Sequence, residues 1–140
     1  MDSELQELLG RTVTGLYVSD DQSLLVVTTD TGTLTFEAEG DCCSESWFAD
    51  ILGVEALLMH TVAAVEDVPL DDYNVKDGRG RQEEDAVYGH RLTTERGYAD
   101  IIYRNSSNGY YGGWLNLASY EGGDPQNDAR LKHILVDWRA

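Results

Sequence analysis

The sequence predicts an α+β fold in which two antiparallel β-meanders form a curved sheet, packed with an N-terminal helix and one short central helix. Two sets of short segments rich in β-branched and aromatic residues, each interrupted by turn residues, predict the meanders. Two other stretches carry apolar residues at the spacing of a helix. A chain of 140 residues is long enough for one ordinary core, so we expect a single domain over residues 1–140.

The N-terminal helix is predicted over residues 3–10. Ser3 is suited to cap its start, and the acidic residues of the first turn favour the positive end of the helix dipole. The leucines at positions 5, 8 and 9 form one apolar stripe, and Gly10 ends the helix.

The first meander consists of predicted strands over residues 12–18, 23–29 and 32–39. A polar segment joins the first two strands, and a tight turn with a glycine joins the second and third. In the third strand, apolar residues at even positions alternate with threonine and glutamate at odd positions. This alternation predicts one buried face and one acidic face.

The central helix is predicted over residues 44–52, and Gly53 follows it. Its apolar residues lie on one side of such a helix: Trp47, Phe48, Ile51 and Leu52. Residues 57–68 then predict a buried strand or a strand pair. The polar and charged stretch at about 66–85 contains glycines, so we expect an exposed acidic loop there.

The second meander consists of predicted strands over residues 87–94, 98–105 and 110–120, all rich in aromatic and β-branched residues. The first two strands turn at residues 95–97, and the next two turn through an Asn-Gly pair that tolerates positive φ. Residues 129–138 are compatible with a last strand or a short helix, and we favour a strand.

The charge of the chain is unevenly distributed. The net charge is −16, and residues 1–75 contain 16 acids and one base, whereas residues 76–140 contain 10 acids and 9 bases. A face with that much negative charge repels phosphate backbones and attracts basic surfaces, so direct nucleic-acid binding is disfavoured. An alternative explanation is coding bias or salt adaptation, because the chain has two lysines against eight arginines.

The N-terminus does not resemble a signal peptide, and no apolar run reaches the roughly 18–20 residues that cross a bilayer. We therefore expect a cytoplasmic protein with no membrane contact.

The segment GDCCSESW, residues 40–47, raises the question of a reactive thiol. A helix N-terminus would stabilise a thiolate at Cys42 or Cys43, but the nearby acidic side chains would raise a thiol pKa instead. A nucleophile also needs a base, and the sequence places none of the three histidines beside it. The structural alternative is a turn and helix cap in which at least one cysteine is buried as a small apolar residue.

The sequence indicates no metal, cofactor or catalytic residues. Adjacent cysteines cannot easily direct both sulfurs at one tetrahedral zinc ion, and the chain has no other cysteine. The second polar and aromatic stretch, residues 104–115, suits either a ligand surface or a hairpin in which aromatic rings cover glycines. The candidate ligand or partner contacts are Asp41, Cys42, Cys43, Ser44, Ser46, Asn105, Ser106, Ser107, Asn108, Tyr110, Tyr111 and Trp114.

Together, GDCCSESWFADI at 40–51 and RNSSNGYYGGWL at 104–115 resemble a family of small uncharacterised bacteriophage proteins, notably those of phages that infect high-GC actinobacteria. The resemblance covers roughly residues 8–118. It implies a viral accessory protein that acts in the host cytoplasm, and it assigns no catalytic residues.

Three functions follow as hypotheses. The first is a non-catalytic binding protein that docks on a host or phage protein with a basic surface, in its sharpest form a DNA mimic or anti-defence factor. The second is a small-ligand binder or enzyme with a pocket between residues 42–46 and 105–114. The third is an oligomeric structural or regulatory phage component that pairs through an exposed strand edge or through the aromatic hairpin. The sequence favours a binding protein over an enzyme.

Overall fold

The computed structural model describes residues 4–40, 45–68, 84–107, 113–118 and 123–139. Two short 3-10 helices, one four-residue α-helix and ten strands occupy these ranges. In chain order they are η1 (Glu4–Leu8), β1 (Val13–Ser19), β2 (Leu24–Thr29), β3 (Gly32–Gly40), β4 (Glu45–Leu52), α1 (Val54–Leu57), β5 (Ala64–Val68), β6 (Glu84–Thr94), β7 (Gly97–Ser107), β8 (Gly113–Ala118), η2 (Pro125–Asn127), β9 (Leu131–His133) and β10 (Trp138–Arg139).

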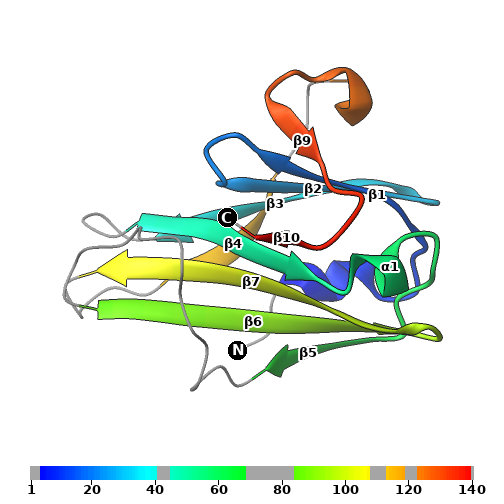
Figure 1. Ribbon diagram of the computed structural model, residues 1–140, viewed down its shortest axis with the longest axis horizontal. Coiled ribbons are helices and arrows are strands. Elements are labelled where there is room, and N and C mark those ends of the chain that lie inside the picture. Colours follow the sequence, from blue (N-terminus) through cyan, green and yellow to red (C-terminus); the bar gives the residue numbers. More distant parts are fainter. Residues whose placement is uncertain (1–3, 41–44, 69–83, 108–112, 119–122, 140) are drawn as a thin grey trace.

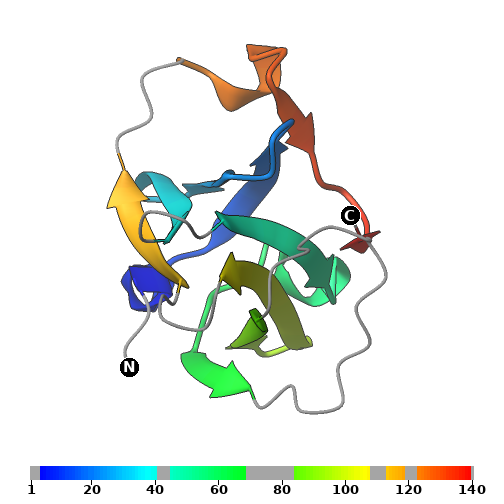
Figure 2. The same ribbon diagram turned by 90° about the vertical axis from the view of Figure 1, so that its left-hand side faces the viewer.

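The strands form two antiparallel five-stranded sheets (Figures 1 and 2). Sheet one has the order β8-β3-β2-β1-β9, and sheet two has the order β10-β4-β7-β6-β5. The predicted α+β class is therefore wrong, because the described residues form a mostly β structure with two layers. The helical elements are single short turns: η1 and α1 lie at one end of the layers, and η2 lies beside β9 at the edge of sheet one (Figure 1).

The first meander is confirmed. Strands β1, β2 and β3 pair in sequence, with Leu16 opposite Val27 and Leu25 opposite Phe36. The alternation in β3 is confirmed in part: Phe36 and Ala38 are buried in the core, but Thr35, on the face predicted to be exposed, is buried as well. Glycine at position 32 has a φ of +130°, which explains why the turn before β3 needs this residue.

The predicted central helix is wrong, because residues 45–52 form strand β4. The register of β4 against β7 shifts by one residue between Phe48 and Asp50, which is a β-bulge. The bulge places Phe48 and Ile51, three residues apart, in the same core cluster, whereas Trp47 packs in a separate cluster. A spacing of three residues on one face imitates a helix in the sequence, and this caused the error.

The bulge in β4 is stabilised by Gln22, which lies in the turn between β1 and β2 of sheet one. The amide of Phe48 donates to the backbone carbonyl of Gln22 at 2.7 Å, and the Gln22 side-chain amide donates to the Phe48 carbonyl at 2.8 Å. The backbone N–H and C=O of Phe48 therefore both have hydrogen-bond partners. The same contacts connect the two sheets at this edge.

The prediction of the second meander is only partly confirmed. Strands β6 and β7 form the predicted hairpin, in which Thr94 pairs with Gly97. Strand β8 does not continue that sheet but pairs with β3 in sheet one, with Phe36 opposite Leu117. Residues 129–138, expected as one strand, contain β9 on the edge of sheet one and β10 on the edge of sheet two.

The N-terminal segment is a five-residue 3-10 helix in place of the predicted α-helix. Five residues cannot offset the cost of nucleating an α-helix, so tertiary burial of the leucines determines the conformation. Leu5 and Leu8 are fully buried in the core, and Gly10 ends the turn with a φ of +79°.

The segment expected to hold a buried strand or strand pair at 57–68 is different in the structure. It contains the end of α1, an isolated bridge from Thr61 to Thr12, and the largely exposed edge strand β5. Residues 66–68 and 84–85, assigned in advance to the acidic loop, belong to β5 and β6. The rest of that predicted loop, 69–83, lies outside the described residues.

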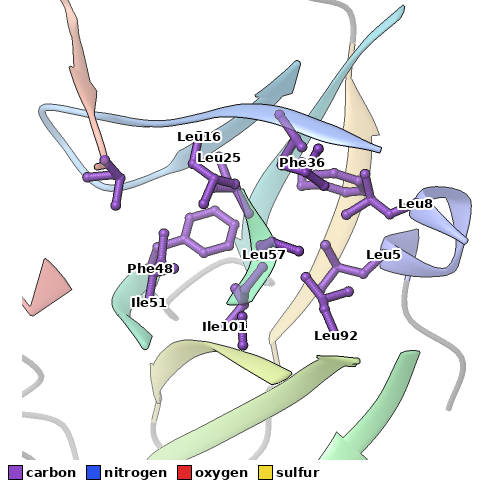
Figure 3. Packing of buried hydrophobic residues seen from close by; sticks show 14 of the residues in the cluster. Leu5, Leu8, Leu16, Leu25, Phe36, Phe48, Ile51, Leu57, Leu92 and Ile101 are labelled. Carbon is purple, nitrogen blue, oxygen red and sulfur yellow. The ribbon is translucent and has the colours of Figure 1, made fainter. Parts of the chain in front are cut away.

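The core lies between the two sheets (Figure 3). Side chains from η1, both sheets and α1 meet there, and the largest fully buried ones include Phe36, Phe48 and Ile101. The C-terminal segment closes one side of this core, because Ile134 is buried and its amide donates to the Leu16 carbonyl at 2.8 Å. In the part of the chain that the structure describes, no helix is long and apolar enough to cross a membrane.

Candidate functional site

The two sequence motifs meet at one end of the sandwich, which we call the motif end. It is the end where β3 finishes and β4 begins, opposite α1 (Figure 1). Ser46 in β4 is the register partner of Asn105 in β7, and Gly40 in β3 is the partner of Gly113 in β8. Both motifs therefore contribute strands to the same end, one pair in each sheet.

A short chain of hydrogen bonds joins the motifs. The Ser46 hydroxyl donates to the backbone carbonyl of Glu39 at 2.9 Å, and the Asn105 Nδ2 donates to Ser46 Oγ at 2.9 Å. Because the serine proton is used on Glu39, its oxygen has to accept from the asparagine, which fixes the amide orientation. The Oδ1 of Asn105 remains buried without a hydrogen-bond partner.

A second buried polar group lies on the neighbouring strand β6. His90 is 6% exposed, and its Nδ1 lies 2.9 Å from Oδ1 of Asp67 on the edge strand β5. This is a hydrogen-bonding distance, and the contact with Asp67 favours the charged imidazole, whereas Nε2 of His90 has no hydrogen-bond partner. Burial lowers the pKa of His90 below its ordinary value, while the Asp67 carboxylate opposes this shift.

Aromatic rings surround this histidine. The rings of His90 and Tyr103 are stacked with centroids 5.6 Å apart, and Tyr88 and Tyr103 are stacked at 4.9 Å. Tyr103 also contacts the Phe48 ring in the core at 6.3 Å. Burial, and next the neighbouring Tyr88 and Asp67, raise the pKa of Tyr103, so its hydroxyl stays protonated at any physiological pH.

We call Ser46, His90, Tyr103 and Asn105 the inter-sheet polar cluster. Tyr103 belongs to the core between the sheets. Asn105 is two residues from Tyr103 on β7, and Ser46 is opposite Asn105. His90 is opposite the core residue Ile101. Side chains at alternate and at directly paired positions share a face, so all four lie on the inner face of sheet two.

A different set of polar residues lies on the outer face of sheet one. Glu37 and Glu39 alternate with the buried Phe36 and Ala38, and therefore project outward. The amide of Asn116 on β8 donates to the Glu39 carboxylate. Partial burial, and then the adjacent carboxylates of Glu39 and Asp21, raise the pKa of Glu37. The carboxylates are thus close enough to repel one another.

The described cations are largely engaged with other groups of the chain. Arg91, Arg130 and Arg139 each form an ion pair, with Asp100, Asp128 and Asp50 respectively. Arg104 is 1% exposed, and its guanidinium lies 4.8 Å from the centre of the Trp47 ring on the outer face of sheet two.

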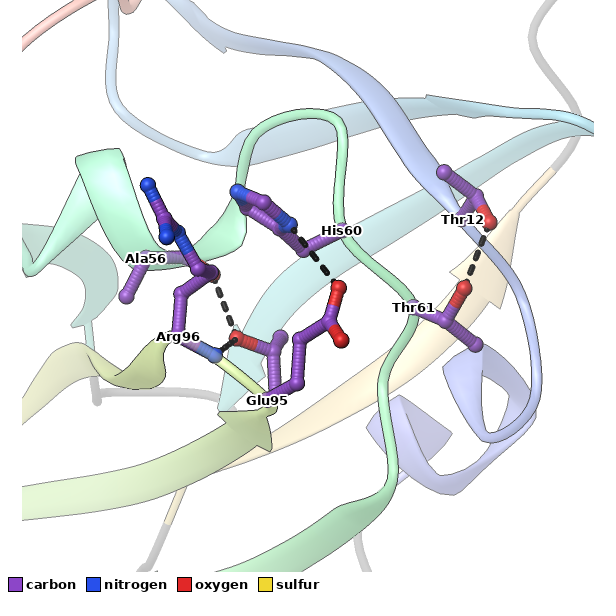
Figure 4. A network of polar contacts seen from close by, with 7 residues as sticks. Thr12, Ala56, His60, Thr61, Glu95 and Arg96 are labelled. Carbon is purple, nitrogen blue, oxygen red and sulfur yellow. Dashed lines mark hydrogen bonds and ion pairs between the residues drawn. The ribbon is translucent and has the colours of Figure 1, made fainter.

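A hollow of about 530 Å³ lies at the opposite end from the motifs, beside α1 and the β6–β7 turn. Gly53, Glu55, Ala56, Glu95 and Arg96 line it. Figure 4 shows the neighbouring contacts: the Thr94 hydroxyl donates to the Ala56 carbonyl at 2.6 Å, and His60 Nδ1 lies 3.7 Å from Glu95. Since Glu95 is 82% exposed, this ion pair is weak.

Among the predicted contacts, the structure brings together only Ser46 and Asn105 as described side chains. The backbones of Ser106, Ser107 and Trp114 lie in β7 and β8, but their side chains are outside the description. The remaining predicted contacts lie outside the described residues: Asp41, Cys42, Cys43, Ser44, Asn108, Tyr110 and Tyr111.

The sequence analysis missed His90 and Tyr103. Both occupy positions where an alternating strand requires a core residue, and a histidine at such a position was the available signal. No group of three or more His, Cys, Asp or Glu side chains with the geometry to hold a metal ion occurs within the described ranges.

Comparison with known proteins gives a family but no activity. A family model described as a domain of unknown function, DUF7448, matches residues 6–117. The chain is also similar to the uncharacterised protein L278 of Acanthamoeba polyphaga mimivirus, with 38% identity over 92 residues. That match covers 59% of this chain and 66% of the mimivirus protein, slightly less than two thirds of its length. No solved structure matches the chain.

These matches agree with the expected resemblance to an uncharacterised viral family in its general form. The assignment to bacteriophages, and the use of the two motifs as its markers, stay predictions. Strands β9 and β10 lie beyond the matched range. Because the family model spans most of the sequence, the chain belongs to the DUF7448 family.

Proposed function

We propose that this DUF7448 protein is a viral accessory protein without catalytic activity, which binds a host or viral protein that has a basic surface. The observation that carries the proposal is the excess of acidic residues in the segment that forms β1 to β3 of sheet one. Residues 12–40, which include β1 to β3 and their turns, contain five acids and no lysine or arginine. A folded surface of one sign steers partners of the opposite sign and repels nucleic acid.

The side-chain arrangement supports this proposal. Partial burial, and after it the neighbouring carboxylates of Glu39 and Asp21, raise the pKa of the outward Glu37, so its charged form is disfavoured in the isolated protein. A cation from a partner would relieve that repulsion. Three described arginines are already paired with carboxylates elsewhere in the chain, so they do not neutralise this face.

The biological setting is also a proposal. The similarity to a mimivirus protein, together with the resemblance of the two motifs to bacteriophage proteins, supports a virus-encoded factor that works in the host cytoplasm. A partner that itself binds nucleic acid would present the required basic surface, and the acidic face would then act as a DNA mimic.

The test is a pull-down from host lysate with the wild-type chain and the variant Glu37→Gln/Glu39→Gln at about 50 mM and about 300 mM salt. We expect a basic protein to be retained by the wild type at low salt, released at high salt, and captured several-fold less by the variant. The matched control, Glu55→Gln/Glu66→Gln, removes two exposed acids outside sheet one. Retention that is equal in all three proteins, or no basic partner at low salt, would contradict the proposal.

A further inference from the structure

We infer that the hollow beside α1 and the β6–β7 turn is a binding site for a small zwitterion, a molecule that carries one carboxylate and one ammonium group, as a free amino acid does. The hollow lies at the end of the sandwich opposite the motif end, and its lining includes neither Glu37 nor Glu39. The proposed protein contact uses those two residues on β3. The inference is therefore independent of the proposed function, and either one can fail without the other.

The first step is the set of charges around the hollow. The lining includes one cation, Arg96, and two carboxylates, Glu55 and Glu95. Within the described ranges, Arg96 forms no ion pair, although both carboxylates border the same space. Glu95 has only the weak contact with Nδ1 of His60 at 3.7 Å. Charges of opposite sign therefore line one hollow without neutralising each other.

The second step is the rigidity of the walls. The Thr94 hydroxyl joins the two walls, because it donates to the Ala56 carbonyl of α1 at 2.6 Å and accepts from the Arg96 amide at 3.2 Å (Figure 4). At the start of α1, the Asp137 carboxylate accepts from the Gly53 amide at 2.9 Å. These bonds attach α1 both to the β6–β7 turn and to the C-terminal segment. The hollow is thus bordered by backbone that is fixed on both sides.

The third step is the chemistry that fits these charges. Arg96 attracts a simple anion, but the two carboxylates repel it, and Arg96 repels a simple cation. A zwitterion avoids both conflicts, because its carboxylate can accept from the guanidinium while its ammonium group donates to a carboxylate. Glu55 is the better partner for the ammonium group, since Glu95 already lies near His60. A ligand of this kind satisfies both signs of charge and adds no net charge.

The fourth step concerns size and strength. A volume of about 530 Å³ lies within the range of roughly 300–1,000 Å³ that is usual for small-molecule sites. The side chains of Glu55, Glu95 and Arg96 are exposed, and exposed ion pairs are individually weak. We therefore expect half-saturation at millimolar ligand, with binding that weakens as salt screens the charges.

The experiment follows the backbone amide resonances of the full chain by NMR while glycine, β-alanine or γ-aminobutyrate is added at low salt. These zwitterions differ in the distance between their two charges, so the series samples the spacing that the hollow accepts. The matched ligand controls lack one charge: acetate, propionate and butyrate lack the ammonium group, and methylamine, ethylamine and propylamine lack the carboxylate. We expect at least one zwitterion to shift the amide resonances of Ala56 and Arg96 saturably, and its single-charge counterparts to cause shifts several-fold smaller.

Variants of the lining complete the test. We expect Arg96→Gln and Glu55→Gln each to weaken zwitterion binding several-fold, whereas Arg96→Lys should retain part of it because the charge remains. The control Glu66→Gln removes an exposed acid on β5 outside the hollow and should leave binding unchanged. The inference is overturned if no zwitterion gives a saturable shift, if the single-charge compounds cause equal shifts, or if either Arg96→Gln or Glu55→Gln binds as tightly as the wild type.

Discussion

The inner faces of the two sheets differ in the side chains that they place in the same core. Sheet one contributes only apolar residues from β1 to β3, such as Leu16, Val27 and Phe36. Sheet two contributes apolar residues such as Ile101 and Leu92, but it also places the polar residues His90, Thr94 and Asn105 on its inner face. The first face has the composition that stability requires, whereas the second includes groups that lower stability.

The largest effect is expected on the apolar face. Phe36→Ala removes a fully buried ring that packs among both sheets, and we expect a loss of about 3–5 kcal/mol in the free energy of unfolding. Urea denaturation followed by circular dichroism measures it. The control Thr33→Ala, on the exposed part of the same strand, should change stability by no more than about 0.5 kcal/mol. A loss below about 1 kcal/mol for Phe36→Ala would show that sheet one does not dominate the core.

The smaller effect is a pH dependence that originates in sheet two. Because burial lowers the pKa of His90 below the 6.5 of a free histidine, the unfolded chain binds this proton more readily than the folded chain. The contribution of His90 to stability is therefore constant above pH 6.5 and is lost progressively as the pH falls below that value towards the folded pKa.

Denaturation curves at several pH values between about 7.5 and 5 test this dependence. As the pH falls over this interval, we expect the free energy of unfolding to decrease less for His90→Leu than for the wild type. The carboxylates contribute equally to the decrease in both proteins. Parallel curves for the two proteins would mean that His90 does not titrate differently in the folded state.

The sequence predicted β1 to β3 of sheet one well because the burial of these strands follows from their apolar residues. Short turns join β1 to β3, and the apolar runs of β1 and β2 are buried on both faces of the strands, so apolar positions in the sequence are buried positions in the fold. Local patterns were enough in this region.

Local sequence patterns did not predict the strands and pairing of sheet two correctly. The bulge in β4 gave Phe48 and Ile51 a helical spacing, and no local signal revealed that Gln22 stabilises the irregular position from another sheet. Strand β8 follows β7 in the chain but pairs with β3 in sheet one. Only tertiary packing decides which sheet a strand at this position joins. Of the candidate site, the contact of Ser46 with Asn105 followed from the two motifs, but the role of His90 depended on knowing which face of β6 is buried.

The most direct test of the difference between the two faces is the free energy of unfolding of His90→Leu at pH 7.5, measured beside Leu92→Ala. Both residues lie on the same face of β6. The account predicts that Leu92→Ala loses about 2–5 kcal/mol, whereas His90→Leu keeps or increases stability, because it removes a buried imidazole whose Nε2 has no hydrogen-bond partner. A loss of about 2 kcal/mol or more in His90→Leu would contradict the account, since the histidine would then be a stabilising part of the core.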